Sequence, residues 1–379
     1  MSLEKKKTNN LSIPFYNNLN GLRFIGALLV FIFHSFTLNR EIWGTFFSNE
    51  IFLKIFKIAS KGHYGVSLFF VLSGFLITSL LINEAKQKEK INPYNFFMRR
   101  LLRIWPLYFI IIIFGFFIFP VLPTGFETQN SLLNYSLFIS NFEELWIGWQ
   151  DSLNFLTITW SVSIEEQFYI TWVALIILIP AFKKGKNYHF YFIILIIISV
   201  IFRLLNYSDE RVIYYHTLSV MSDFAIGGLL SYLTINKKWL LALCKISKTK
   251  ILITYILGGT LIIFSKNIFE NHLICIKQLF IGLYFGFIIF EQIYCENSFY
   301  KADNIYGFFK LGNISYGIYM YHCIIIYFVQ QIIINYNIQN SIFGFLLFIL
   351  LSGYITIIIS RLSYRYIEKP ILDLKKNFR

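Results

Sequence analysis

Apolar runs of membrane-spanning length recur along the whole chain and are separated by short polar stretches. A transmembrane helix needs roughly 20 apolar residues to cross a hydrocarbon layer of about 30 Å. Segments that approach this length, bounded by charges, Pro or Asn, fall at 21–38, 64–83, 102–120, 164–182, 189–206, 217–235, 250–265, 272–292, 314–335 and 341–361. The pattern predicts an all-α polytopic membrane protein with about ten transmembrane helices.

The longest connection between these segments, 121–163, contains one shorter apolar piece, "LLNYSLFIS". This piece is too brief to span a bilayer, so we expect it to be re-entrant or interfacial. No internal repeat is visible along the chain. We therefore interpret 21–366 as one transmembrane domain between an N-terminal tail, 1–20, and a C-terminal tail, 367–379.

Composition agrees with the segment pattern. Of the 379 residues, 56% are hydrophobic and only 14% are charged, which is more apolar material than a soluble core needs. The four cysteines have no metal-ligand spacing, so the sequence predicts neither a disulfide framework nor a metal site.

The distribution of Lys and Arg predicts the orientation. Basic residues near segment ends are held on the cytoplasmic side, and most of the 34 Lys and Arg fall on one side if the N-terminus is cytoplasmic. We expect both termini to be cytoplasmic and the first segment to act as a signal anchor. The net charge of +14 then lies on the inner face, where it is attracted to anionic lipid of the bilayer. Nucleic-acid binding is not indicated.

The first segment, "NGLRFIGALLVFIFHSF", carries two ionisable side chains, Arg23 and His34. They are separated by about 20° around a helix and by roughly 16 Å along it, so they share one face. An ionisable group at membrane depth costs at least about 2.5 kcal/mol and tends to face a partner or a wet cavity. Arg23 could be an interfacial anchor, whereas for His34 a functional role is the better interpretation.

Further polar residues occur at the ends of other segments. Arg99, Arg100 and Arg103 lie at the start of the third segment, where a guanidinium pair is suited to clamp phosphates or to anchor the helix. The second segment contains Ser73 in "FFVLSGF". A serine at this position is explained equally well by close packing of helices and by a role in lining a cavity. Asp223 in the sixth segment is expected to line the same cavity as His34.

The fourth segment opens with "TWSVSIEEQFYITW", in which Ser161, Glu165 and Tyr169 recur every four residues. This spacing places them on one side of a helix. A carboxylate at this position is either a solvated cap or a group that accepts or orients a proton. We expect the stripe and His34 to meet across one cavity.

Together these motifs resemble the acyltransferase-3 family of bacterial integral-membrane O-acyltransferases, in a stand-alone form without a fused hydrolase-like domain. The motifs that carry the resemblance are Arg23 with His34, "FFVLSGF", Arg100 with Arg103, Ser161 with Glu165 and Tyr169, "LGNISYGIYMYH" at 311–322 and "YRYIEKP" at 364–370. The family more often has Trp-His where this chain has Tyr321 and His322, which leaves the role of His322, a candidate cavity residue, open.

The resemblance implies transfer of an acyl group, usually acetyl, from cytoplasmic acyl-coenzyme A to a hydroxyl of an extracytoplasmic glycan, in a multi-pass protein of the bacterial inner membrane. Arg100, Arg103 and Arg99 are then expected to hold the coenzyme's phosphates and Arg23 its pantetheine arm. His34 is expected to act as general base or nucleophile.

Glu165 is expected to orient the imidazole of His34. Proteins of glycan assembly are possible partners. The alternative is a proton-coupled transporter or flippase of a polysaccharide precursor, in which Arg23, His34 and Glu165 form a path without covalent chemistry.

Overall fold

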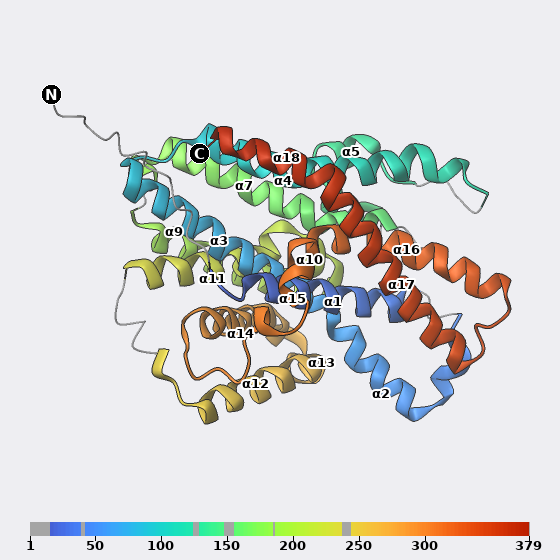
Figure 1. Ribbon diagram of the computed structural model, residues 1–379. Coiled ribbons are helices and arrows are strands. Elements are labelled where there is room, and N and C mark those ends of the chain that lie inside the picture. Colours follow the sequence, from blue (N-terminus) through green and yellow to red (C-terminus); the bar gives the residue numbers. More distant parts are fainter. Residues whose placement is uncertain are drawn as a thin grey trace.

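The computed structural model describes residues 16–38, 42–123, 129–147, 155–184, 186–236 and 244–378. Within these ranges the chain is almost entirely helical and contains no strand, and the long helices pack into one bundle (Figure 1).

Among the described residues, nine helical stretches are long and apolar enough to cross a membrane. The main helices of these stretches are α1 (Leu19–Thr37), α3 (Gly65–Lys88), α4 (Pro93–Ile113), α7 (Trp160–Leu178), α9 (Tyr188–Leu205), α11 (Thr217–Asn236), α14 (Ile274–Tyr294), α16 (Ser315–Asn335) and α17 (Ile342–Ser363). This confirms the predicted all-α polytopic membrane fold.

The remaining expected segment, 250–265, corresponds to α12 (Lys248–Ile263). It has 16 residues, somewhat fewer than the roughly 20 that a spanning helix needs, and it packs against α14 at the edge of the bundle (Figure 1). With α12 included, the chain crosses the bundle an even number of times and returns to its starting side. The cytoplasmic placement of that side remains a prediction.

Short helices connect the long ones or, in the case of the last, follow them. They are α2 (Glu50–Ala59), α5 (Leu132–Ser136), α6 (Ser140–Ile147), α8 (Pro180–Lys183), α10 (Glu210–Tyr215), α13 (Ser265–Ile268), α15 (Phe308–Asn313) and α18 (Lys369–Asp373). The apolar piece in the long connection forms α5 and the start of α6, neither of which is long enough to span a membrane, and α6 packs against α7 and α10.

The most extensive helix contact joins α3 and α11. A methyl group built on Gly74 would overlap the backbone of Phe224, and one built on Gly227 would overlap the carbonyl of Val71. The two backbones therefore touch, which only residues without a side chain allow. Beside this contact the rings of Phe70 and Phe224 stack with centroids 4.6 Å apart, so α3 is held in a fixed position against the bundle.

The beginning of α1 is fixed by a carboxylate from a distant part of the chain. The two oxygens of Asp303 each accept a backbone hydrogen bond of 2.6 Å, from Asn18 and from Gly21. These bonds satisfy amide groups that the first turn of a helix leaves without a partner. Asn20 also donates to Asn313 of α15 at 3.0 Å, so the end of α1 that carries Arg23 is tied to α15.

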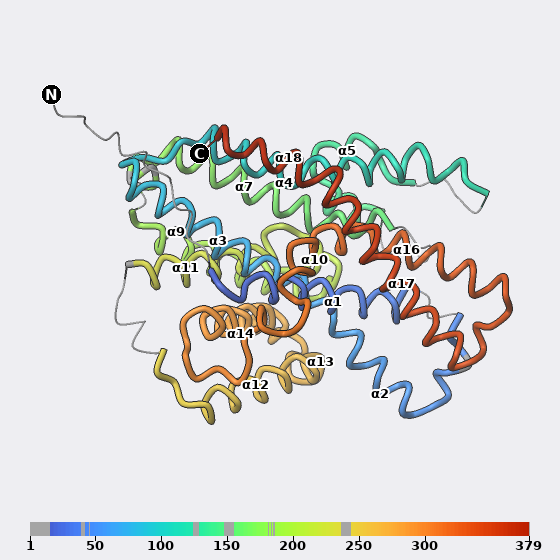
Figure 2. Tube along the Cα trace, in the orientation of Figure 1, coloured from blue at the N-terminus to red at the C-terminus, as the bar shows by residue number. Residues whose placement is uncertain are grey.

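The C-terminal residues return to the beginning of α4, as the red end of the trace beside α4 in Figure 2 shows. The last described turn, η10 (Leu374–Phe378), packs against α4. Here Arg99 donates to the carbonyl oxygen of Phe378 at 2.7 Å. The starts of α1 and α4 and the C-terminal turn therefore lie on one side of the bundle.

Candidate active site

Three arginines from two helices converge on one small cavity, which we call the arginine cavity. Its volume is about 90 Å³, and Arg23 of α1 and Arg100 and Arg103 of α4 line it. Helix α4 begins at Pro93 after Asn92, whose side chain accepts a hydrogen bond from the backbone of the first turn. The resulting helical spacing brings Arg100 and Arg103 to the same face.

Arg100 is held by its surroundings, but one of its donors has no partner. The side chain is 9% exposed, and its guanidinium carbon lies 5.9 Å from the ring centroids of both Phe96 and Tyr169. No hydrogen-bond partner within the described residues reaches its buried Nε. Because buried donors are almost always satisfied, this donor is available to an acceptor from outside the chain.

The arginine cavity is strongly positive. Arg23 donates to Asn20 Oδ1 at 3.1 Å, which satisfies a donor without neutralising the charge. Repulsion among Arg23, Arg100 and Arg103 is opposed by only one carboxylate of the cavity wall, and Lys375 of the C-terminal turn lies near these arginines. An anionic ligand would relieve this repulsion.

Glu165 is the carboxylate that lines the arginine cavity, together with Ser73, Ser161 and Tyr169. Ser73 donates to Glu165 Oε1 at 2.5 Å, and the hydroxyl of Tyr169 donates to the same oxygen. The structure thus brings the predicted stripe of α7 together with Ser73 of α3. It places this group beside the arginines and not beside His34.

Arg99 lies outside the arginine cavity. Its guanidinium forms a 2.6 Å ion pair with Glu84, in addition to the bond to Phe378. Both interactions are internal to the fold. The position of Arg99 therefore favours a structural role over the expected contact with phosphates.

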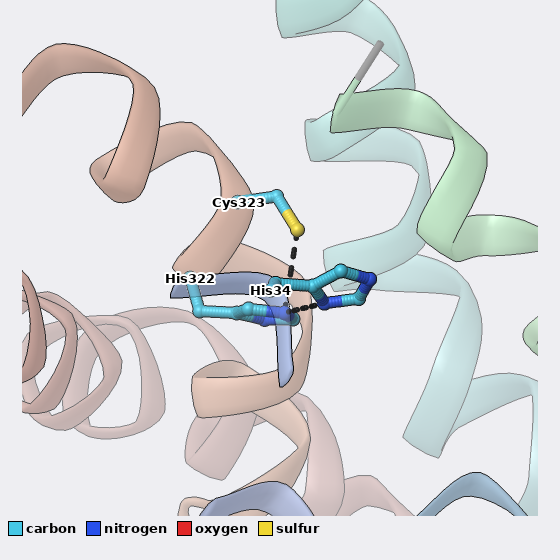
Figure 3. Close-up of side chains that lie close together, drawn as sticks. All are labelled: His34, His322 and Cys323. Atoms are coloured by element: carbon cyan, nitrogen blue, oxygen red, sulfur yellow. Dashed lines mark hydrogen bonds between the residues drawn. The ribbon is translucent and has the colours of Figure 1, made fainter. Parts of the chain in front are cut away.

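His34 meets a second histidine instead of the expected carboxylate. Its Nδ1 lies 2.7 Å from Nε2 of His322 on α16, and Sγ of Cys323 lies 3.3 Å from the same Nε2 (Figure 3). The ring nitrogens of the two histidines point toward one another, from helices that are far apart in sequence. His322 is fully buried, whereas His34 is half-buried.

His34 and Cys323 line a larger cavity of about 970 Å³, which we call the histidine cavity. Its walls combine aromatic and polar side chains, among them Trp160 and Tyr214, whose ring centroids are 4.9 Å apart. Lysines and carboxylates are also present in the wall: Lys61, Lys266, Lys277, Glu144, Glu210 and Glu270.

Glu144 of α6 is the most unusual titratable group of this wall outside the membrane-spanning helices. Its side chain is 6% exposed and accepts a hydrogen bond of 3.1 Å from Tyr135. Burial raises the pKa of the carboxyl group to about 7. A carboxyl group that changes charge near neutral pH therefore faces the histidine cavity.

The two cavities are neighbours, and Val66 and Phe70 of α3 line both of them. The expectation that His34 and the stripe of α7 meet across a single cavity is thus not what the structure shows. Helical periodicity gave the correct faces of both helices, but it carries no information on how the helices are displaced along their axes. That displacement puts Glu165 level with Arg23 and not with His34.

Asp223 was expected to line a cavity with His34, and it does not line either of these two. It is fully buried and accepts a 2.5 Å hydrogen bond from Gln278, which does line the histidine cavity. Buried Arg203 is its nearby opposite charge. The burial and this partnership favour a structural role for Asp223.

Sequence reasoning missed three residues that line the histidine cavity, Glu144, Trp160 and Tyr214, and one that lies near the arginine cavity, Lys375. Lys375 resembled an ordinary positive residue of a tail, and Glu144 follows an apolar piece that gave no functional signal. Trp160 and Tyr214 are aromatic residues at the ends of apolar segments, where interfacial anchoring is the ordinary interpretation. Only the folded arrangement of α6, α7 and α10 groups Glu144, Trp160 and Tyr214 around one space.

Comparison with known proteins gives a consistent picture. The family described as "Acyltransferase domain" matches residues 16–362. The protein SACOL0978 of Staphylococcus aureus strain COL is 27% identical over 389 residues, covering 98% of this chain and 59% of the relative. The O-acetyltransferase OatA of Staphylococcus aureus strain NCTC 8325 / PS 47 is 27% identical over 401 residues, covering 99% of this chain and 60% of the relative.

The chain thus spans about three fifths of the length of these curated relatives. No solved structure is a significant match.

Proposed function

This chain belongs to the acyltransferase-domain family, and on that premise we propose that it is a membrane O-acetyltransferase that uses both cavities. The acetyl donor is acetyl-coenzyme A, bound from the cytoplasm at the arginine cavity. The acceptor is a hydroxyl group of a saccharide outside the bacterial inner membrane, bound in the histidine cavity. The relatives named as O-acetyltransferases support the choice of an acetyl group.

The single observation that carries the proposal is the positive cavity with an unpartnered buried donor. The wall of this cavity contains three arginines, Arg23, Arg100 and Arg103, and one carboxylate, Glu165. The buried Nε of Arg100 has no hydrogen-bond acceptor among the described residues. Coenzyme A carries several phosphate charges, and arginine binds phosphate with charge-assisted hydrogen bonds. The donor set therefore fits a phosphorylated acyl carrier.

The size of the arginine cavity restricts how such a donor binds. Pockets that enclose a whole small molecule measure roughly 300–1,000 Å³, whereas this cavity measures about 90 Å³. It accommodates a thin chain and not a nucleotide. We therefore place the nucleotide at the mouth, near Lys375, and the pantetheine arm inside, directed past Val66 and Phe70 toward His34.

The histidine cavity suits a saccharide. A sugar presents apolar ring faces and several hydroxyl groups, and the wall offers the faces of Trp160 and Tyr214 beside the polar groups of Glu144 and Lys61. Its volume of about 970 Å³ lies at the upper end of the range for enclosed ligands. Proteins of glycan assembly are the partners that would deliver this acceptor.

The reaction needs one proton acceptor at the meeting point of the two substrates. The acceptor hydroxyl gives its proton to the free ring nitrogen of His34 while its oxygen attacks the thioester carbon. A carbon–oxygen bond forms, the carbon–sulfur bond breaks, and the coenzyme leaves as a thiolate that takes up a proton. If His34 acts instead as nucleophile, the acetyl group rests on its nitrogen before transfer.

The test uses the purified protein in detergent or nanodiscs, supplied with acetyl-coenzyme A, and follows release of the coenzyme thiol by slow hydrolysis, in which water takes the place of the saccharide hydroxyl as acetyl acceptor. We expect His34→Ala to abolish release. We expect Arg100→Gln to raise KM for acetyl-coenzyme A about tenfold or more, because a hydrogen bond to a charged group contributes roughly 1.5–3 kcal/mol.

Arg361→Gln is the matched control, since Arg361 is an exposed arginine near the end of α17. It should leave KM unchanged. A proton-coupled transporter or flippase would release no thiol in any of these proteins, and that result would reject the proposed function.

A further inference from the structure

His322 has a fixed pattern of hydrogen-bond partners. Its Nδ1 lies 2.6 Å from the carbonyl oxygen of Tyr319 and 3.2 Å from that of Ile318. Carbonyl oxygens only accept hydrogen bonds, so Nδ1 of His322 must carry the hydrogen. A neutral imidazole has one N–H group, and its other nitrogen, Nε2, is therefore an acceptor.

The state of His34 follows from that of His322. His322 Nε2 accepts, and it lies 2.7 Å from Nδ1 of His34, so Nδ1 of His34 must be the donor. The proton of His34 then sits on Nδ1, and the lone pair sits on Nε2. Because His34 lines the histidine cavity while His322 is fully buried, the ring of His34 is the one that a substrate reaches.

We propose that His322 is a positioning residue that holds His34 in the tautomer whose Nε2 lone pair is free for the reaction. This inference rests on the proposed function, because it assigns the reacting nitrogen of the same histidine. Both routes left open above require this lone pair, either to take the hydroxyl proton or to attack the thioester carbon. The backbone of α16 is thus the fixed end of a chain of two hydrogen bonds that ends at the reacting nitrogen.

The same contact serves the reaction after proton transfer. When Nε2 of His34 has taken the proton, both ring nitrogens are donors, and Nδ1 continues to donate to His322. The charge that forms on His34 is therefore met by an acceptor that is already in place, and no side chain must move. A neutral histidine here fixes the tautomer and the orientation of its partner, as the carboxylate does in a Ser-His-Asp triad, but without the carboxylate's charge.

A shared metal ion is the competing explanation for the group of His34, His322 and Cys323, whose ligand atoms lie within 4.8 Å of one another. The nitrogens of the two histidines, however, face each other at hydrogen-bond distance. An ion between them would require them to separate. The hydrogen-bonded arrangement explains the observed geometry directly.

The experiment compares His322→Leu with His322→Gln in the full chain. We expect His322→Leu to lower kcat by roughly 10²–10⁴, the range for loss of a positioned proton acceptor or of its tautomer, with KM for acetyl-coenzyme A unchanged. His322→Gln should recover activity at least tenfold over His322→Leu, because its amide oxygen can accept from Nδ1 of His34. His189→Leu, a histidine outside both cavities, is the matched control and should keep the kcat of the native protein.

A second measurement does not depend on turnover. The chain has six histidines, so nitrogen NMR of protein labelled with ¹⁵N in histidine can identify the His34 signals by their loss in His34→Gln. We expect a protonated Nδ1 and a bare Nε2 in the native protein, and a shift toward protonated Nε2 in His322→Leu.

Native kcat in His322→Leu, or a native His34 protonated on Nε2, overturns the inference. Equal losses in the Leu and Gln variants and in Cys323→Ala, together with bound metal in the native protein, also overturn it in favour of a metal site. If the native protein released no thiol, the proposed function would fail, and the NMR signals would still decide the tautomer.

Discussion

At the scale of single residues, the ionisation of Glu144 in the wall of the histidine cavity makes the stability of the protein depend on pH. Burial raises the pKa of its carboxyl group from 4.5 to about 7. Between these two values the folded protein holds a proton that the unfolded chain has lost, so the free energy of unfolding falls as pH rises through this window. The fall is at most about 3.4 kcal/mol and is complete above the folded pKa.

We therefore expect the unfolding temperature of the purified protein to decrease as the pH is raised from 5 to 8. Glu144→Gln should make this decrease smaller, because an amide has no proton to lose in this window. Thermal unfolding followed by circular dichroism measures it. Glu296→Gln, at an exposed position, is the control and should behave like the native protein. Identical pH dependence in native protein and Glu144→Gln would show that Glu144 does not titrate there.

Residue identity was the most predictable part of the candidate site. Arg23 and His34 stand out in the sequence because an ionisable side chain in an apolar segment has a free-energy cost, so its presence indicates a function or a partner. Their partners were not predictable in the same way. His34 and His322 are 288 positions apart, and no local spacing relates them. The prediction that Glu165 meets His34 rests on the inferred topology, which puts both residues in the outer half of the membrane.

At the scale of helices, α3 separates the two cavities. Val66 and Phe70 lie one turn apart on it, and both line both cavities. The close contact of Gly74 and Gly227 with the neighbouring backbones leaves α3 no room to move sideways. Under the proposed function, passage of an acyl chain would therefore depend on the side chains at these two positions and not on displacement of the helix.

We expect Val66→Trp to block acyl passage, since the larger ring fills the boundary between the cavities. Acetyl transfer should fall at least tenfold, and binding of acetyl-coenzyme A should change little because the arginines are untouched. Isothermal titration and a thiol-release assay on the same preparation separate these effects. Val66→Ala is the matched control and should transfer at or above the native rate, and undiminished transfer by Val66→Trp would contradict this role of α3.

At the scale of the whole molecule, the apolar pattern was sufficient to predict the class of fold, because each span needs a run of similar length. The shortness of α12 and the division of the long connection into α5 and α6 were not predictable. They depend on packing against α14 and α7, which no periodicity records. The orientation in the membrane remains a prediction from the distribution of Lys and Arg.

That orientation can be measured with one cysteine introduced on either side of the bundle, in a protein in which Cys244 is replaced by Ser and the other three cysteines, which are buried, are kept. Tyr306, fully exposed beside α15, is expected on the cytoplasmic side, and Glu50, exposed at the start of α2, on the outer side. A thiol reagent that does not cross membranes should label Glu50→Cys in intact cells and label Tyr306→Cys only after lysis. The opposite result would invert the orientation.

The apolar boundary formed by Val66 and Phe70 also has an energetic consequence for the cell. A water-filled channel from one face to the other would let protons and ions flow down the membrane voltage, dissipating about 2.3 kcal/mol per charge for every 100 mV. The narrow, uncharged pantetheine arm can push apolar side chains aside, whereas a hydrated ion cannot pass between them. Under the proposed function, an acyl group could therefore reach the outer side without opening a path for ions across the membrane.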